Sequence, residues 1–208
     1  MHLKFIINKY YDKKFVSDKK TLDYIEREYK NSIEQLEKSR KEYQESWDSI
    51  NNKFSNYVEK VTGYKWFYKE YDCVVSVVHR GLSNWGNAPI IVRMWKLNPI
   101  KMRRITAHEL ILSHYFEIYK RHYKKEGLSD GQVWALAEIA AFALTSLTYD
   151  VKKFWPGDTE YYTNHNYPHI VKLQNQLKEP FINRRNFYEY IMKGIELVKE
   201  YPDMWPGP

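Results

Sequence analysis

The sequence predicts a single α+β domain over residues 1–208, mainly helical with a small β-sheet. Three observations indicate this fold class: short runs of β-branched residues typical of strands, longer segments with the apolar spacing of helices, and no repeat or linker that would divide the chain. The length of 208 residues and the hydrophobic content of 43% suffice for one core of ordinary size.

Three segments are predicted as strands. Residues 3–8 place Phe5 and Ile7 on one face and Ile6 on the other, as the period of a strand requires. Residues 73–79 and 89–95 are rich in Val and Ile, and the second run begins with Pro89, where a missing N–H is tolerated. Between them, residues 80–87 have the composition of a turn-rich loop.

A long amphipathic helix is predicted between the first two strands. It begins at Ser17 or Asp18, carries apolar residues mostly three and four apart, and ends at Gly63. Because residues 37–46 are highly charged, the helix either bends or projects as half of an antiparallel pair. A helix of this length packs on its own domain or on a second subunit, so a dimer through this helix is an open alternative.

Four further helices are predicted in the remainder of the chain. The first begins with Asn98 as N-cap and Pro99 at the first helical position, continues to about Lys125 and ends at Gly127. A capping box at residues 129–132 opens the second, which extends to about residue 148 and is apolar nearly all round, as a buried helix is. The last two are expected at residues 168–177 and 186–199.

Composition restricts the class of protein. The net charge of +7 permits nonspecific attraction to nucleic acid. The lysines, however, spread along the predicted helices and form no dense block, so solvent-exposed helix faces explain the charge better than a nucleic-acid site does. No apolar run reaches the roughly 18 residues of a membrane-spanning helix. Cys73 is the only cysteine, which excludes an intramolecular disulfide and suggests a reducing cytoplasm. No motif for nucleotide hydrolysis or serine hydrolysis is present.

The most informative segment is residues 106–114, which contains a His-Glu pair followed by a second histidine. In the zinc-protease motif His-Glu-x-x-His, the two histidines lie at i and i+4 on one helical face. Here the second histidine, His114, follows His108 by six residues, and Leu112 occupies the usual position. On an ideal helix His114 is displaced by about 240° from His108, so a shared metal ion requires the helix to unwind or bulge between Ile111 and His114.

Glu138 is the second candidate, because it interrupts the apolar run of residues 133–144. A carboxylate buried there without a partner would cost several kcal/mol. It is therefore expected to pair with an arginine or lysine, with a histidine, or with a metal ion. Arg103 and Arg104 on the preceding helix are the candidates for a plain ion pair.

Together, the long helix, the small sheet, the His-Glu helix and the following helix with Glu138 resemble the zincin metallopeptidases, in the minimal gluzincin type. The resemblance covers residues 1–148 and rests on residues 106–110, on the run 90–94 and on the spacing to Glu138. It implies a zinc cofactor, His108 and Glu138 as zinc ligands, and Glu109 as the general base. The run 90–94 would then be the edge strand along which a peptide or protein substrate lies.

The third zinc ligand is expected to be His114 on a distorted helix, giving an atypical His-Glu-(x)4-His motif. His165 and His169 are the alternative ligands, whereas His79 and His122 are interpreted as surface or packing residues. Two other functions remain open: a zincin-like binding or structural module without catalysis, which Leu112 favours, and a basic nucleic-acid-binding protein, which rests on charge alone.

Overall fold

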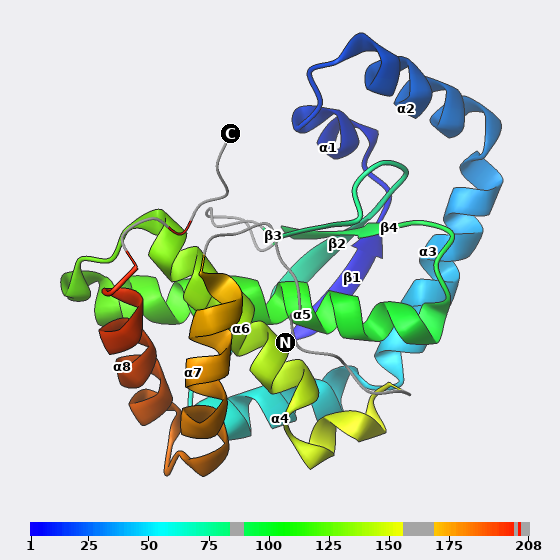
Figure 1. Cartoon of the computed structure of the whole chain (residues 1–208). Coiled ribbons are helices and arrows are strands. Elements are labelled where there is room, and N and C mark those ends of the chain that lie inside the picture. Colours follow the sequence, from blue (N-terminus) through cyan, green and yellow to red (C-terminus); the bar gives the residue numbers. More distant parts are fainter. Residues whose placement is uncertain (84–89, 156–168, 202–203, 205–208) are drawn as a thin grey trace. The chain divides into compact units, whose positions relative to one another are not determined.

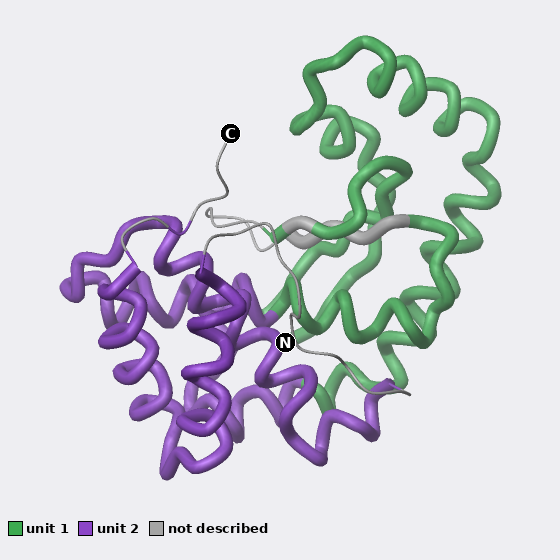
Figure 2. The backbone as a smooth tube through the Cα atoms, viewed as in Figure 1, with its two compact units in different colours: residues 1–54, 68–110 green, residues 55–67, 111–208 purple. Residues whose placement is uncertain are grey.

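A computed structural model of the chain describes residues 1–83, 90–155, 169–201 and 204. It is mainly helical with one small sheet, which confirms the predicted α+β class. Its internal contacts define two compact units (Figure 2): residues 1–54 with 68–110, and residues 55–67 with 111–208. The assignment of the whole chain to a single domain stays a prediction.

The first unit is built on a four-stranded sheet in the order β1-β2-β4-β3 (Figure 1). The strands are β1 (His2–Ile6), β2 (Glu70–Ser76), β3 (Gly81–Ser83) and β4 (Ile90–Met94). Strands β1, β2 and β4 are parallel, whereas β3 pairs antiparallel with β4 and forms the edge. The expectation that the run 90–94 is the edge strand is therefore wrong, because β3 covers that side of β4.

The long helix is divided into three, namely α2 (Lys19–Asn31), α3 (Ile33–Asp48) and α4 (Asn51–Thr62). Both predicted ends are confirmed: the Asp18 side chain caps α2, and Gly63 follows α4 with a φ of 77°. The prediction of one continuous helix is wrong. Ser32 leaves helical geometry with a φ of −128°, and a second interruption lies between α3 and α4. A short helix not predicted, α1 (Lys9–Lys14), precedes them.

Helix α3 covers the sheet and also provides hydrogen-bond partners for backbone groups of its first strand, β1. The Gln44 side chain accepts a hydrogen bond from Phe5 N at 2.9 Å and donates one to the Leu3 carbonyl at 3.0 Å. Because β1 is an outer strand, this amide occupies backbone groups that would otherwise lack a ladder partner. The fully buried Tyr43 and Trp47 extend from the same helix into the core.

The second unit is helical. It contains most of α4, the C-terminal part of α5 (Pro99–Ile118) from Ile111 on, and α6 (Asp130–Ser146), α7 (Ile170–Asn183) and α8 (Phe187–Val198). Helix α6 is its centre, because most of its residues are buried and it contacts both α7 and α8. The predicted capping box of Ser129 and Gln132 and the buried character of this helix are both confirmed.

Two ends in this unit differ from expectation. Helix α5 stops at Ile118 and continues as a π-helical turn (Tyr119–Tyr123) and a 3-10 turn before Gly127, which has a φ of 69°. Helix α7 begins later and ends later than predicted, since it accommodates Pro180 near its C-terminal end. Among the described residues, no helix is both long and apolar enough to cross a bilayer.

Candidate functional site

Helix α5 carries the His-Glu motif and remains α-helical from Pro99 to Ile118. The Asn98 side chain caps it by accepting hydrogen bonds from two backbone N–H groups of the first turn at 3.0 and 3.1 Å. At about 100° per residue, the six steps from His108 to His114 turn through about 240°. The two imidazoles therefore leave different sides of α5, and a metal ion shared by both would require the helix to rearrange between them.

Glu109 lies at the contact between α5 and the sheet edge in the first unit. The residue is 8% exposed, and its carboxylate oxygen Oε2 accepts a short hydrogen bond from the Ser83 hydroxyl. The same hydroxyl also lies 3.1 Å from the Glu109 carbonyl oxygen. Since Ser83 is the last residue of β3, the edge strand holds the predicted general base in a fixed orientation. The preceding residue, His108, is half-buried.

His114 lies in the second unit, enclosed by aromatic rings. Its ring centroid is 4.6 Å from that of Trp66 and 5.3 Å from that of Phe67, with interplanar angles of 37° and 39°. The residue is 1% exposed, and neither ring nitrogen has a hydrogen-bond partner in the described part of the chain. Burial lowers the pKa of His114 to about 3, opposed weakly by the charge of Glu59, so the imidazole is neutral at pH 7.

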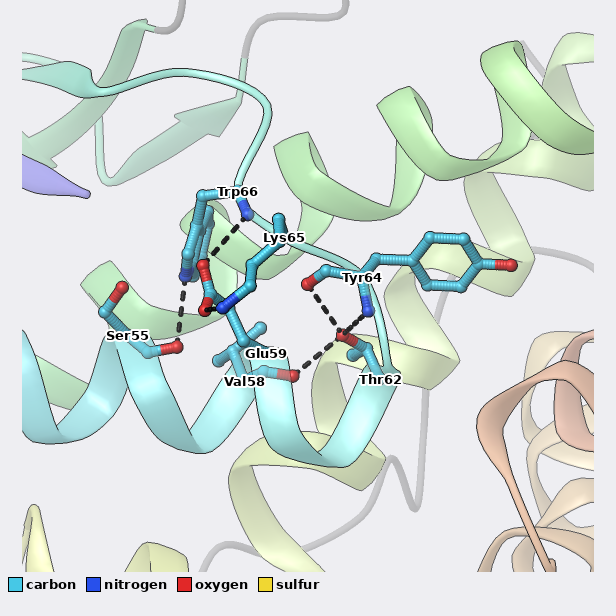
Figure 3. A network of polar contacts seen from close by, with 7 residues as sticks. All are labelled: Ser55, Val58, Glu59, Thr62, Tyr64, Lys65 and Trp66. Carbon is cyan, nitrogen blue, oxygen red and sulfur yellow. Dashed lines mark hydrogen bonds and ion pairs between the residues drawn. The ribbon is translucent and has the colours of Figure 1, made fainter.

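The segment that encloses His114 is fixed by a polar network at the end of α4 (Figure 3). Trp66 Nε1 donates to the Ser55 carbonyl at 3.2 Å, and Trp66 N donates to the Glu59 carboxylate at 3.3 Å. Lys65 Nζ donates to the other oxygen of Glu59 at 2.7 Å. The indole is therefore anchored at both its ring and its backbone, and this helps hold the wall of the His114 site in place.

Glu138 is buried in α6, as predicted, with 8% of its surface exposed. The residue is not without an interaction partner, and the expected pairing of its carboxylate stays a prediction. His114 and Glu138 belong to the second unit, whereas His108 and Glu109 belong to the first.

The other histidines that were considered as ligands lie in packing or surface positions or outside the described residues. His79 Nε2 lies 3.0 Å from the Asp12 carbonyl oxygen, which agrees with its interpretation as a packing residue. His122 lies beside the Tyr64 ring at 5.1 Å on the surface of the second unit. His169 stacks on Tyr201 at 5.0 Å, just before α7. His165 falls in the segment that the structure does not describe.

The described ranges contain no group of three or more His, Cys, Asp or Glu side chains that could hold a metal ion. They therefore offer no fitted zinc centre from which a reaction step can be derived. Zinc binding by His108, His114 and Glu138 stays a prediction from the sequence.

A buried carboxylate that sequence reasoning missed lies in the first unit. Asp12, on α1, is fully buried and accepts hydrogen bonds from Val77 N at 3.0 Å and from the Tyr29 hydroxyl at 3.1 Å. Burial raises the pKa of Asp12, and hydrogen bonds from Ser76, Val77 and Tyr29 oppose the shift. No local pattern marks this residue, because its partners are 17 and 65 positions away in the chain.

Comparison with models of protein families, with curated proteins and with solved structures found no match. At the candidate site, the structure shows a side-chain hydrogen bond between Ser83 on the edge strand β3 and Glu109 on α5.

Proposed function

We propose that the protein is a zincin-like, metal-dependent peptidase that binds an extended peptide along β3 and uses Glu109 as its general base. The observation that carries the proposal is the hydrogen bond between the Ser83 hydroxyl and the Glu109 carboxylate. It joins a candidate base to an outer strand of the sheet, where a peptide strand could be added.

The sheet topology supports peptide binding at β3. Among the described residues β3 pairs with β4 alone and stands last in the strand order, so its other edge has no strand partner there and could offer backbone N–H and C=O groups. An extended peptide can pair with such groups and form a further strand. Because Ser83 belongs to β3, a peptide bound there would lie near Glu109.

The chemistry assigned to Glu109 is proton transfer. A carboxylate oxygen can accept a proton from a water molecule as that water attacks the peptide carbonyl. The zincin resemblance assigns the zinc ion to His108, His114 and Glu138, and zinc held by them would lower the pKa of water and polarise the carbonyl. Ser83 is a positioning residue, since it orients the Glu109 carboxylate and does not itself react.

A second candidate function is a peptide-binding module of the same fold without catalysis. Two specific observations favour it: α5 continues as an α-helix through the motif, and His114 is enclosed by Trp66 and Phe67. The buried Leu112 stands where the common motif has its second histidine. Both functions share the peptide site at β3 and differ in whether bound peptide is cleaved.

The two functions are separated by measuring zinc content, peptide binding and peptide cleavage on the same preparations. We expect zinc-loaded wild type to cleave unstructured peptides, and Glu109→Gln to lower the rate by about 100-fold to 10,000-fold while peptide binding persists. His108→Ala should remove zinc. Glu70→Gln, which changes an exposed carboxylate on β2, is the matched control and should keep full activity.

Cleavage that survives Glu109→Gln would refute the assignment of the base. Binding without cleavage in zinc-treated wild type would establish the non-catalytic module instead. Absence of both binding and cleavage over a broad peptide set would eliminate both functions.

A further inference from the structure

An open pocket of about 660 Å³ lies in the second unit, between the C-terminal end of α4 and the start of α8. The described residues that line it include three cations, Lys60, Arg184 and Arg185, and two tyrosines, Tyr64 and Tyr188, and none of them is a carboxylate. The volume lies within the range of sites that bind small organic ligands. Its composition indicates an anionic ligand that also carries a flat apolar part.

Arg184 is the most informative cation of this pocket. Its guanidinium lies 3.8 Å from the centroid of the Phe181 ring, and Nη1 donates a hydrogen bond to the Phe181 carbonyl. The side chain is thereby held in one orientation, and burial lowers its pKa. Within the described part of the chain it forms no ion pair with a carboxylate. A fixed, half-buried guanidinium without an internal counter-ion favours an anion from solution.

The tyrosines form a connected aromatic wall beside the cations. The Tyr64 and Tyr123 hydroxyls are 2.8 Å apart, and the Tyr123 ring lies 6.2 Å from the Tyr188 ring at an interplanar angle of 34°. Tyr188 is nevertheless 56% exposed, so much of its surface remains open to a ligand. An exposed ring held by its neighbours offers a stacking surface at little cost in conformational entropy.

The start of α8 adds backbone donors to the same pocket. Asn186 caps this twelve-residue helix by accepting from Glu189 N at 3.0 Å, and the N–H groups of the first turn point towards its N-terminal end. Glu189 is the competing anion, since it forms an ion pair with Arg185. The Arg185 side chain is 88% exposed, and such surface pairs are weak, so a phosphate can compete for it.

We propose that this pocket binds a nucleoside monophosphate. The phosphate would lie between Arg184, Lys60 and the first turn of α8, and the base would stack on Tyr188. The inference is independent of the proposed peptidase activity, because the pocket lies wholly within the second unit and uses none of the residues assigned to peptide cleavage.

Isothermal titration calorimetry of the full chain with AMP, ribose 5-phosphate and adenosine tests the proposal. We expect AMP to bind at least about tenfold more tightly than either fragment, because only AMP engages both the cations and the aromatic wall. Lys60→Gln and Tyr188→Leu should each weaken AMP binding by about tenfold. Glu189→Gln should strengthen it severalfold by releasing Arg185.

Lys65→Gln is the matched control, because it removes another exposed lysine, close in sequence, that does not line the pocket. It should leave AMP affinity within about twofold of wild type. Circular dichroism of each variant verifies folding. Equal affinities for AMP and ribose 5-phosphate, or an unchanged affinity in Tyr188→Leu, would overturn stacking of the base. No AMP binding at millimolar concentration, or a Lys65→Gln effect as large as that of Lys60→Gln, would overturn the site altogether.

Discussion

Acidification from pH 7 to pH 5 should destabilise the protein through His114. This imidazole is buried between Trp66 and Phe67 without a hydrogen-bond partner in the described residues, and burial lowers its pKa to about 3. In the unfolded chain its pKa is about 6.5. Between these values the unfolded state takes up a proton that the native state excludes, so the free energy of unfolding decreases as the pH falls.

The magnitude follows from the two pKa values. With a native pKa of about 3, the native state stays unprotonated at pH 5, whereas the unfolded chain is almost fully protonated at this position. Linkage then gives a loss of about 2 kcal/mol between pH 7 and pH 5, at about 1.4 kcal/mol for each pH unit below 6.5. Titration of His114 leaves the free energy of unfolding unchanged above pH 6.5 and lowers it steadily as the pH falls from 6.5 towards 3.

Urea denaturation followed by circular dichroism at pH 7 and pH 5 measures this loss, compared between wild type and His114→Leu. Leucine removes the titrating group and keeps an apolar side chain between the two rings, so the variant should lack about 2 kcal/mol of the wild-type pH dependence. His2→Leu, at an exposed position of β1, is the control and should retain the pH dependence due to His114. Equal pH dependence in wild type and His114→Leu would show that His114 is not held as a buried neutral imidazole.

Two further substitutions test the packing of the second unit. Tyr57→Phe should lower the free energy of unfolding by about 1–2 kcal/mol, measured by urea denaturation, because the Tyr57 hydroxyl lies 2.7 Å from the Leu144 carbonyl and 2.6 Å from the Thr148 hydroxyl. Ser129→Ala should lower it by about 1 kcal/mol in the same assay, because the capping box of α6 is lost. A neutral result for either would mean that water replaces the lost contact.

Helix starts with a side-chain cap could be predicted from the sequence, because each depends on a few adjacent residues. Asp18, Asn98 and the Ser129–Gln132 box place an oxygen acceptor directly before a helix, and the structure uses all three as caps. Gly127 likewise adopts the left-handed conformation expected at a helix end. Such signals are local, so they can be recognised in the sequence without tertiary information.

Features that depend on distant partners were missed. Ser32 interrupts the long helix although the apolar stripe continues on both sides, so the spacing of apolar residues does not reveal this break. Strand β3 has three residues, too few for a periodic signal, and it is defined by pairing with β4. For the same reason Ser83 could not be recognised as the partner of Glu109, although it determines the orientation of that carboxylate.

The His108–His114 spacing marks the limit of sequence reasoning at the candidate site. A metal ion shared by both histidines requires two extra residues between them to be absorbed, whereas a π-type bulge absorbs one. The π-helical turn of this helix lies at Tyr119–Tyr123, beyond His114, and leaves the spacing unchanged.

Rearranging α5 would break a few backbone hydrogen bonds, at about 1 kcal/mol each, and would remove His114 from its aromatic site. A structural zinc site supplies about 10 kcal/mol, so metal binding could drive the change. Loss of zinc in both His108→Ala and His114→Ala would therefore mean that α5 adopts a second conformation when metal is bound.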